Sequence, residues 1–384
     1  MTGLRARATA ARRRARLPFN ARLPLNARLP LNARRPREAR RTRRTRLPYG
    51  VLLALLGAAL LAAATAGIAA GSVGLAAGDV WRIVLHRIVP ALVEPTWPPV
   101  RETIVMDVRV PRVLLCGIVG AGLSVCGMAL QALVRNPLAD PMLLGVSSGA
   151  SVGAVLVLVL HVSLFGAFSL PLAAFAGALA ALSTVYFLAR SGGRMTTVRL
   201  VLAGVATAEV LSAVASYLIV TSGEPRKAES AMRWMLGGFG GTTWELVPIP
   251  AAAVLLGTVA LLGVARPLNL LLAGEEAAAS MGLNAHRFRA WSFVLVALVI
   301  GAIVAVSGSI GFVGLMLPHV ARLLAGADHR RALPVVALLG AAFLIAADLA
   351  ARTVIAPEEV PIGVLTALVG GPFFLWLMRR KASR

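Results

Sequence analysis

A run of 22 consecutive uncharged residues, residues 113–134, most strongly constrains what this chain can fold into. As an α-helix the run would extend about 33 Å, enough to cross the hydrocarbon core of a bilayer. Arg109 and Arg112 precede it, and Arg135 follows it at the start of a proline-containing segment. Glycines recur inside the run and let neighbouring helices approach closely where lipid supplies no hydrophobic driving force. The run is therefore predicted to be a tightly packed transmembrane helix in a bundle.

The composition extends this prediction to the whole chain. Of its 384 residues 58% are hydrophobic and 14% are charged, and the mean hydropathy is +0.81, which is typical of a polytopic membrane protein and not of a soluble domain. The expected fold class is all-α, with about ten transmembrane helices. Their predicted positions are residues 51–71, 113–134, 142–160, 164–188, 200–220, 246–264, 290–306, 310–324, 333–349 and 360–378. Of these, 310–324 is the weakest prediction, because it is short and contains Pro318, His319 and Arg322.

Charge predicts the orientation of these helices. Starting from a cytoplasmic N-terminus, every even-numbered helix ends next to arginine or lysine, as the positive-inside rule requires. The opposite side receives mainly acidic residues, and residues 78–107, with Trp81 and Trp97, are predicted to form an external loop containing an interfacial helix. The chain is therefore expected in the cytoplasmic membrane of the cell, with both termini in the cytoplasm.

The N-terminal segment differs from the rest. Residues 1–48 contain 16 arginines and one acid, Glu38, and include the repeat ARLPFN ARLPLN ARLPLN. Proline at every sixth position and mutual repulsion of the arginines predict a disordered cytoplasmic tail, distinct from a membrane domain at residues 49–384. Nucleic-acid binding is not expected, because Phe19 is the only aromatic residue before Tyr49 and no folded module is present. A location next to anionic lipid is favoured instead.

Several kinds of chemistry have no matching pattern in the sequence. Cys116 and Cys126 would lie about 15 Å apart along one helix, too far for a disulfide bond to each other. No G-x-x-x-x-G-K-[ST] motif occurs, so any ATP hydrolysis would belong to a partner protein. No cysteine and histidine cluster has metal-ligand spacing, so neither a metal site nor a cofactor is expected.

Four sequence blocks resemble the FecCD family of permeases. They are RVPR at residues 109–112, QALVRNPLADPMLLGVSSGA at 131–150, GFVGLMLPHVARLLAGADHRRALP at 311–334 and ADLAARTVIAPEEVPIGVLTALVGGPFFLWLM at 347–378. The resemblance covers about residues 50–380. One departure is GGFGG at residues 237–241, where the family more often has Gly-Ser-Leu.

The resemblance implies the architecture of a type II ABC importer permease. Such a permease is not an enzyme. It dimerises with an identical or related permease around a central pathway, and it works with a cytoplasmic ATPase dimer and an extracytoplasmic substrate-binding protein. The resemblance implies a ferric siderophore as substrate, with vitamin B12 and haem as alternatives. Iron would then cross inside its chelate.

The resemblance also implies two groups of working residues. Arg109, Arg112 and Arg352 match the family's docking arginines, which meet acidic side chains of the binding protein. Interfacial snorkelling is the alternative reading, but their position on the otherwise acidic side favours docking. GEEAAASMG is similar to the loop that touches the ATPase, and a short helix held between two spans is expected to pack on a partner. The predicted coupling residues are Gly274, Glu275, Glu276, Ala277, Ala278 and Gly282.

Acidic residues within the predicted spans are also compatible with another class of transporter. Glu209 and Asp348 lie in or near predicted spans, where ionisable residues are usually functional. We expect Glu209 to hydrogen-bond between helices, Asp348 to pair with Arg352, and His319 to follow a helix break at Pro318. A proton-driven secondary transporter would instead use Glu209 and His319 as a relay, and a structural membrane anchor would have no pathway.

Overall fold

The computed structural model describes residues 47–71, 74–191, 194–195 and 197–382. The predicted tail, residues 1–48, lies outside the described residues except for Leu47 and Pro48, so its disorder stays a prediction. Within the described residues the chain is helical, and the all-α class is confirmed. A short antiparallel hairpin between α6 and α7 was not predicted; it pairs β1 (Arg190–Ser191) with β2 (Arg194–Met195).

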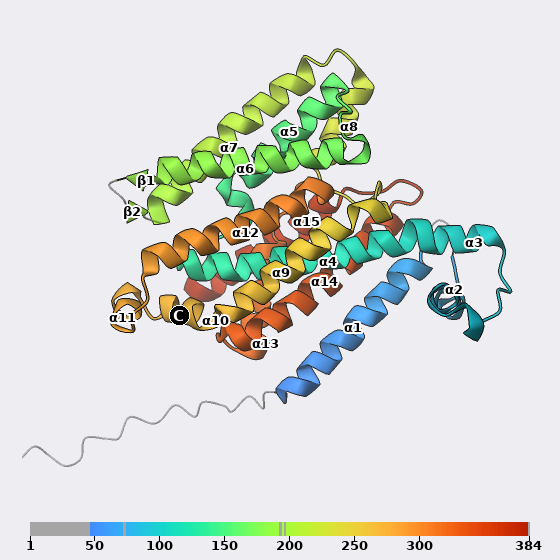
Figure 1. The fold of residues 1–384 in the computed structure, drawn as a ribbon, viewed down its shortest axis with the longest axis horizontal. Helices are drawn as coiled ribbons and strands as arrows, with labels where there is room; N and C mark the ends of the chain where they lie inside the picture. Colours follow the sequence, from blue (N-terminus) through green and yellow to red (C-terminus); the bar gives the residue numbers. More distant parts are fainter. Residues whose placement is uncertain (1–46, 72–73, 192–193, 196, 383–384) are drawn as a thin grey trace, which may run out of the picture. The chain divides into compact units, whose positions relative to one another are not determined.

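The α-helices follow one another along the chain with short connections (Figure 1). Their bounds are α1 Tyr49–Ala69, α2 Ala77–Ile88, α3 Pro99–Thr103, α4 Val110–Val134, α5 Val146–Leu160, α6 Ser169–Ala189, α7 Thr197–Val220, α8 Pro225–Met235, α9 Pro248–Gly263, α10 Ala265–Leu272, α11 Glu275–Ser280, α12 Ala285–Ser307, α13 Val313–Ala325, α14 His329–Thr353 and α15 Ile362–Ala382.

Each of the ten predicted apolar runs overlaps one of these helices. In the described part of the chain, eight helical segments are long and apolar enough to cross a membrane. They correspond to α1, α4, α6, α7, α9, α12, α14 and α15. The other two runs form the shorter apolar helices α5 and α13. The short α13 agrees with the weak signal of residues 310–324.

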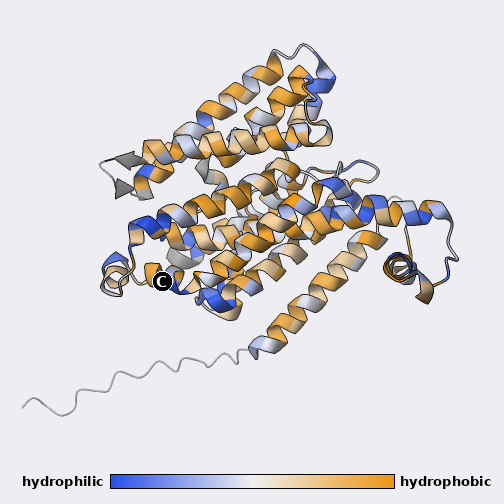
Figure 2. Ribbon diagram, viewed as in Figure 1, coloured by the Kyte–Doolittle hydropathy of each residue, from blue (hydrophilic) through white to orange (hydrophobic). Residues whose placement is uncertain are grey.

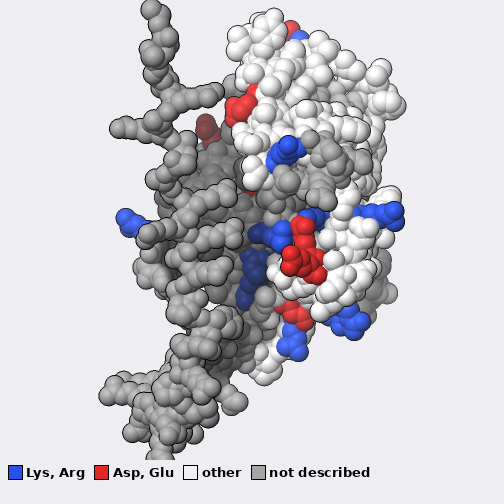
Figure 3. Space-filling view, turned by 90° about the vertical axis from the view of Figure 1, so that its left-hand side faces the viewer, with Lys and Arg blue, Asp and Glu red and all other residues white. Residues whose placement is uncertain are grey.

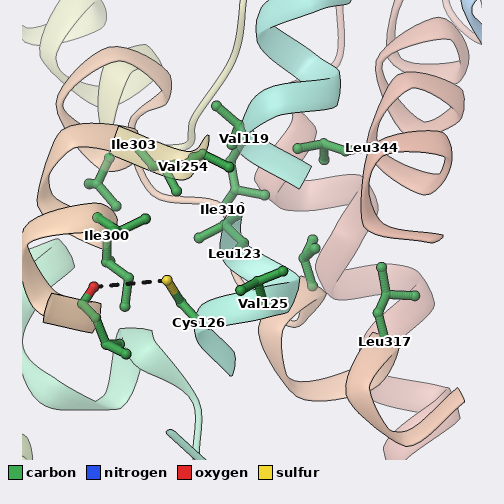
Figure 4. Packing of buried hydrophobic residues seen from close by; sticks show 14 of the residues in the cluster. Val119, Leu123, Val125, Cys126, Val254, Ile300, Ile303, Ile310, Leu317 and Leu344 are labelled. Carbon is green, nitrogen blue, oxygen red and sulfur yellow. Dashed lines mark hydrogen bonds between the residues drawn. The ribbon is translucent and has the colours of Figure 1, made fainter. Parts of the chain in front are cut away.

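Helix α4 lies at the centre of the packing. In the segment Pro99–Val134, which includes α4, 78% of the most apolar stretch of 18 residues is buried. Helix α4 packs against α9, α12, α13 and α14. In Figure 4, Val119 and Leu123 of α4 lie beside Val254 of α9 and Ile303 of α12, and Leu344 of α14 lies on the other side. An apolar helix surrounded by others agrees with the prediction from its charge-free sequence.

Glycines set the closest approaches of α4 to its neighbours. A Cβ on Gly120 would overlap the backbone carbonyl of Gly340 in α14, and one on Gly127 would overlap that of Gly314 in α13. The contact of α5 with α6 depends in the same way on Gly149 opposite Gly177. These contacts confirm that the small residues pack helices together, because backbone can approach backbone only where no side chain intervenes.

Two predicted boundaries were wrong. The external loop at residues 78–107 contains the expected helix α2, but helix resumes at α3 and continues through a π-helical turn, Ile104–Arg109, into α4. Proline is tolerated in a first helical turn, and no breaker separates Pro99 from α4. The break expected at Pro318 is also absent, since α13 is continuous through this residue. The chain breaks earlier, between α12 and α13, around Gly308.

Polar residues concentrate at the two ends of the bundle, whereas the middles of the helices are apolar (Figure 2). We call the end at the start of α4 the Arg112 end and the opposite end, at the C-terminus of α4, the Arg135 end. The first includes the connection between α14 and α15, and the second includes α10 and α11. The two predicted groups of working residues therefore lie at opposite ends of the bundle.

Candidate functional site

Arg112 joins two acidic residues from the C-terminal part of the chain. Its guanidinium donates to both carboxylate oxygens of Asp348 in α14, with the shortest distance, 2.8 Å, from Nη2 to Oδ1. Nη1 and Nη2 also donate to Glu359 Oε1 and Oε2, each at 2.9 Å. Asp348 is 1% exposed, whereas the Glu359 side chain is 45% exposed. Arg112 therefore connects a buried carboxylate to one at the surface.

The other two predicted docking arginines hold the end of α1. Arg352 lies 2.9 Å, Nε to Oδ2, from Asp348, which confirms the predicted pairing. Arg352 also donates from Nη1 and Nη2 to the carbonyl oxygens of Ala70 and Gly67. Arg109 donates to the carbonyl oxygens of Ile68 and Ala69. The last carbonyls of a helix lack intrahelical partners, so two guanidinium groups satisfy the end of α1.

The three arginine side chains are largely buried. Arg109 and Arg112 are 5% and 8% exposed, and the side chain of Arg352 is 8% exposed. All three side chains are therefore largely buried in the described chain. Their role in docking stays a prediction, and Arg112 reaches the surface through its contact with the half-exposed Glu359.

The predicted coupling segment forms the short helix α11. Gly274 precedes it with φ of 113°, which favours glycine, and Gly282 follows it with φ of 80°. Ala278 is fully buried, whereas Glu275 and Glu276 are exposed. Ala277 lies between these in the helix, half-buried. One side of α11 is thus packed on the protein and the other side is free to meet a partner.

Ion pairs attach α11 to two long helices. Glu275 Oε1 lies 3.0 Å from Nη2 of Arg135, at the end of α4, and also accepts from Nη1 of Arg289 in α12. These guanidinium groups, chiefly that of Arg289, lower the pKa of Glu275 below its ordinary value. Figure 3 views the molecule from this side and shows basic and acidic side chains next to one another. A force on α11 would therefore act directly on α4 and α12.

Structure and prediction differ for the intramembrane residues. Glu209 is exposed in the middle of α7, and among the described residues no hydrogen bond or ion pair to it is found, so the expected bond between helices was wrong. His319 lies edge-on to Phe373 of α15, with ring centroids 6.2 Å apart. Gly237, in the segment that departs from the family pattern, packs against the carbonyl of Ser309 with φ of 74°.

The sequence did not reveal the ion-pair partners of the predicted docking arginines or of the predicted coupling segment. Glu359 lies among the acidic residues of the side predicted to be external, and Arg135 and Arg289 lie among the basic residues of the side predicted to be cytoplasmic, but the sequence pairs none of them. Each partner is far away in sequence, 247 residues from Arg112 in the first case and 140 residues between Arg135 and Glu275 in the second. No local spacing could reveal them. Among the described residues, no group of three histidine, cysteine or acidic side chains could hold a metal ion.

Comparison with known proteins gives a consistent result. Residues 55–380 match the model of the FecCD transport family. A cobalamin import system permease protein of Halobacterium salinarum is 45% identical over 75% of this chain and 76% of its own length. An Fe(3+) dicitrate transport system permease protein of Escherichia coli is 40% identical over 72% of this chain and 85% of its own length.

A solved structure extends the likeness to three dimensions. It is described as an inward-facing conformation of a metal-chelate type ABC transporter. The TM-score is 0.75 at 31% sequence identity, and the match covers 86% of this chain and all of the other.

Proposed function

This chain belongs to the FecCD transport family and is a multi-pass permease subunit of an ABC importer, and we propose that its substrate is a ferric siderophore. The observation that carries the proposal is the likeness, over 86% of this chain, to a structure described as a transporter of the metal-chelate type. A relative named for ferric dicitrate supports an iron chelate. Vitamin B12 is the first alternative, since another relative is named for cobalamin, and haem is the second. The family assignment speaks against the proton-driven transporter and the structural anchor.

A polar stripe on α7 supports a pathway shared with a second permease subunit. Glu209, Ser212 and Ser216 are exposed and follow the i, i+3, i+7 spacing of one helix face. Glu209 lies in mid-span, where a carboxylate exposed to lipid is costly. We propose that this face lines a water-filled pathway at the axis of the permease dimer, whether the second subunit is identical or a paralogue.

For docking, we propose an exchange of carboxylates on Arg112. The Arg112 end would lie outside the cell, and an acidic side chain of the binding protein would take the place of Glu359 on the outer edge of the guanidinium. Asp348 would keep its own contact, so Arg112 would never be left without a buried partner. Arg109 and Arg352 would position this surface by holding the end of α1.

For coupling, we propose that the Arg135 end lies in the cytoplasm and that α11 meets the ATPase dimer. ATP binding and hydrolysis in the partner would shift α11, and its ion pairs would pass the movement to α4 and α12. The pathway would then open alternately to the two sides of the membrane.

Reconstitution tests the function and the substrate together. The permease, its co-purified ATPase and its binding protein are placed in proteoliposomes without an ion gradient, and uptake of a radiolabelled ferric siderophore, cobalamin and haem is compared with and without ATP. We expect ATP-dependent uptake of the siderophore. Uptake of cobalamin or haem alone would replace the substrate, and uptake driven only by a proton gradient would overturn the importer mechanism.

A further inference from the structure

A basic cavity at the Arg135 end is not used by the proposed transport cycle. It lies between α4, α10, α13 and the start of α14, beside the coupling helix, and has a volume of about 210 Å³. By the same measure, roughly 15 Å³ is enough for one water molecule. Its wall includes Gln131, Arg135, Arg322 and His329, and none of its lining residues is acidic. The cavity is therefore large enough for a compact ligand and positively charged.

Arg322 lacks an acidic partner within the part of the chain that is described. Its Nη2 donates to Gln131 Oε1 at 2.6 Å, a neutral acceptor, and no carboxylate forms an ion pair with it there. Gln131 is itself fixed, because its Nε2 donates to the carbonyls of Gly314 and Leu315. A partly buried guanidinium with only neutral contacts is an incomplete arrangement, since its charge is removed from water without compensation.

The other polar residues of the wall are held in place. Arg135 reaches the cavity while its Nη2 contacts Glu275, and its side chain is 41% exposed. The ring of His329 is fixed by a hydrogen bond between its Nδ1 and Asn269 Oδ1 at 2.6 Å. Arg322 and His329 are thus held in place on the wall of the cavity, and a ligand would share Arg135 with Glu275.

We propose that this cavity binds a phosphoryl anion between Arg322 and Arg135. Guanidinium groups form charge-assisted, bidentate hydrogen bonds with phosphate oxygens, and basic pockets between transmembrane helices on the cytoplasmic side bind phospholipid headgroups. Free phosphate and the headgroup of an anionic lipid share this chemistry. A bound anion would compete with Glu275 for Arg135 and so loosen one attachment of the coupling helix.

Purified permease in nanodiscs separates the two sources. In nanodiscs of phosphatidylcholine, inorganic phosphate is titrated against chloride at constant ionic strength, and the shift of the thermal unfolding midpoint is followed. In nanodiscs containing phosphatidylglycerol and no free phosphate, native mass spectrometry counts the lipids that remain bound. We expect saturable stabilisation by phosphate, retention of phosphatidylglycerol, or both.

Variants locate the site. Arg322→Gln should weaken the affinity for phosphate by about tenfold or more, as expected for a lost charged hydrogen bond. Ala327→Glu adds a carboxylate to the wall of the cavity without removing a native partner and should also abolish anion binding. Arg330→Gln, an exposed arginine at the same end that does not line the cavity, should retain it. If Arg322→Gln fails to fold, Arg322→Lys and Ala327→Glu carry the test.

Two results would overturn the proposal. One is the absence of any phosphate or phosphatidylglycerol effect on the wild type. The other is binding that persists unchanged in Ala327→Glu and in the folded Arg322 variant. If no anion binds but Ala327→Glu prevents assembly with the ATPase, the cavity receives a carboxylate of the partner protein instead. None of these measurements depends on transport, so their failure would leave the proposed function untouched.

Discussion

At the scale of single residues, the Arg112 end is organised by one buried carboxylate. Asp348 is 1% exposed and lies between two guanidinium groups, those of Arg112 and Arg352. An ion pair of this kind can add little stability by itself, because both charges lose their hydration. Removing one member is costly, since the remaining charge stays buried. The arrangement therefore ties α4, α14 and the end of α1 together in one geometry.

We expect Asp348→Asn to destabilise the protein strongly, because Arg352 would lose its carboxylate partner and Arg112 would keep only the half-exposed Glu359. Breaking a buried pair costs about 3–5 kcal/mol. The control is Asp79→Asn, which breaks an exposed pair with Arg101 and should cost about 0–1 kcal/mol. Unfolding in mixed micelles measures both. Equal stability of the two variants would show that the negative charge of Asp348 is not needed to stabilise the two buried arginines.

Glu359 tests the proposed exchange of carboxylates. Glu359→Gln should weaken the internal competitor and raise the affinity for the binding protein by up to about fivefold, as expected for a half-exposed pair. Glu358→Gln, which changes an exposed neighbour, is the control. Binding is measured with the permease in nanodiscs. If Glu359→Gln binds the binding protein as tightly as the wild type or more weakly, the proposed exchange of carboxylates on Arg112 is wrong.

The contact between Arg112 and Glu359 should be lost at low pH. The hydrogen bond with Arg112 lowers the pKa of Glu359 below its ordinary value of 4.5. A carboxylate with a lowered pKa in the folded protein contributes stability above its unfolded pKa and loses it as the pH falls through the folded value. The internal contact is therefore complete at neutral pH and is lost only below the usual range of glutamate.

At the scale of elements, α11 is a short helix whose position depends on its neighbours. Six residues are too few for a helix that is stable by itself. Ala278 is buried against the protein and Glu275 is attached to α4 and α12. Glu276 has neither an ion pair nor a hydrogen bond within the described part of the chain. The two glutamates should therefore serve different purposes.

We expect Glu276→Lys to weaken association with the ATPase and to leave the permease as stable as before. Glu275→Gln should instead leave association largely intact and reduce the stimulation of ATP hydrolysis by substrate, because the link to Arg135 and Arg289 is weakened. Glu229→Lys, an exposed glutamate on α8, is the control. Pull-down and ATPase assays distinguish the two effects. The same response from both glutamates would argue against this division.

The contact of α4 with α14 makes a second prediction at this scale. Gly120→Ala should destabilise the protein by at least about 1–3 kcal/mol, because the added Cβ overlaps the backbone of Gly340. Gly57→Ala is the matched control, since a Cβ there meets nothing within 4 Å in α1. Alanine is a better helix former than glycine, so this control should be neutral or more stable by up to about 1 kcal/mol. The same micelle unfolding experiment measures both.

At the scale of the whole molecule, the described membrane domain leaves a polar face on α7 that lipid could not cover cheaply. The exposed Glu209 and the serines that follow it imply contact with water or with a second subunit. Helix α9 instead exposes Val259 and other apolar residues to its surroundings, as expected of a lipid-facing surface. The two faces predict different neighbours in the assembled transporter.

Cysteine cross-linking tests this difference. In a background with Cys116 and Cys126 replaced by alanine, Ser212→Cys or Ser216→Cys should react with a water-soluble maleimide and cross-link permease subunits through a short bifunctional reagent. Val259→Cys should do neither, because lipid covers it. Reaction of Val259→Cys alone would place the subunit interface and the pathway on the opposite side of the domain.

The sequence by itself determined the positions of the helices and the family of the protein. In lipid, every backbone polar group must be hydrogen-bonded within the protein, and a charge-free run as long as residues 113–134 has the length of a spanning helix and about twice that of a spanning β-strand. Local signals also located the short α11, because glycines and a glutamate–alanine run act within a few residues. They failed at residues 99–109, where helix begins well before α4, and at Pro318, through which α13 continues.

Only the tertiary structure decided which charges meet. Arg112 and Glu359 come together because α4 and α14 pack through Gly120 and Gly340, although 247 residues separate the two charges. The same packing buries Arg112, and it leaves Arg322 beside a cavity with a neutral partner. Pairing over such separations depends on helix contacts in three dimensions. Burial and electrostatics, which govern the chemistry of these arginines, follow from those contacts and not from sequence spacing.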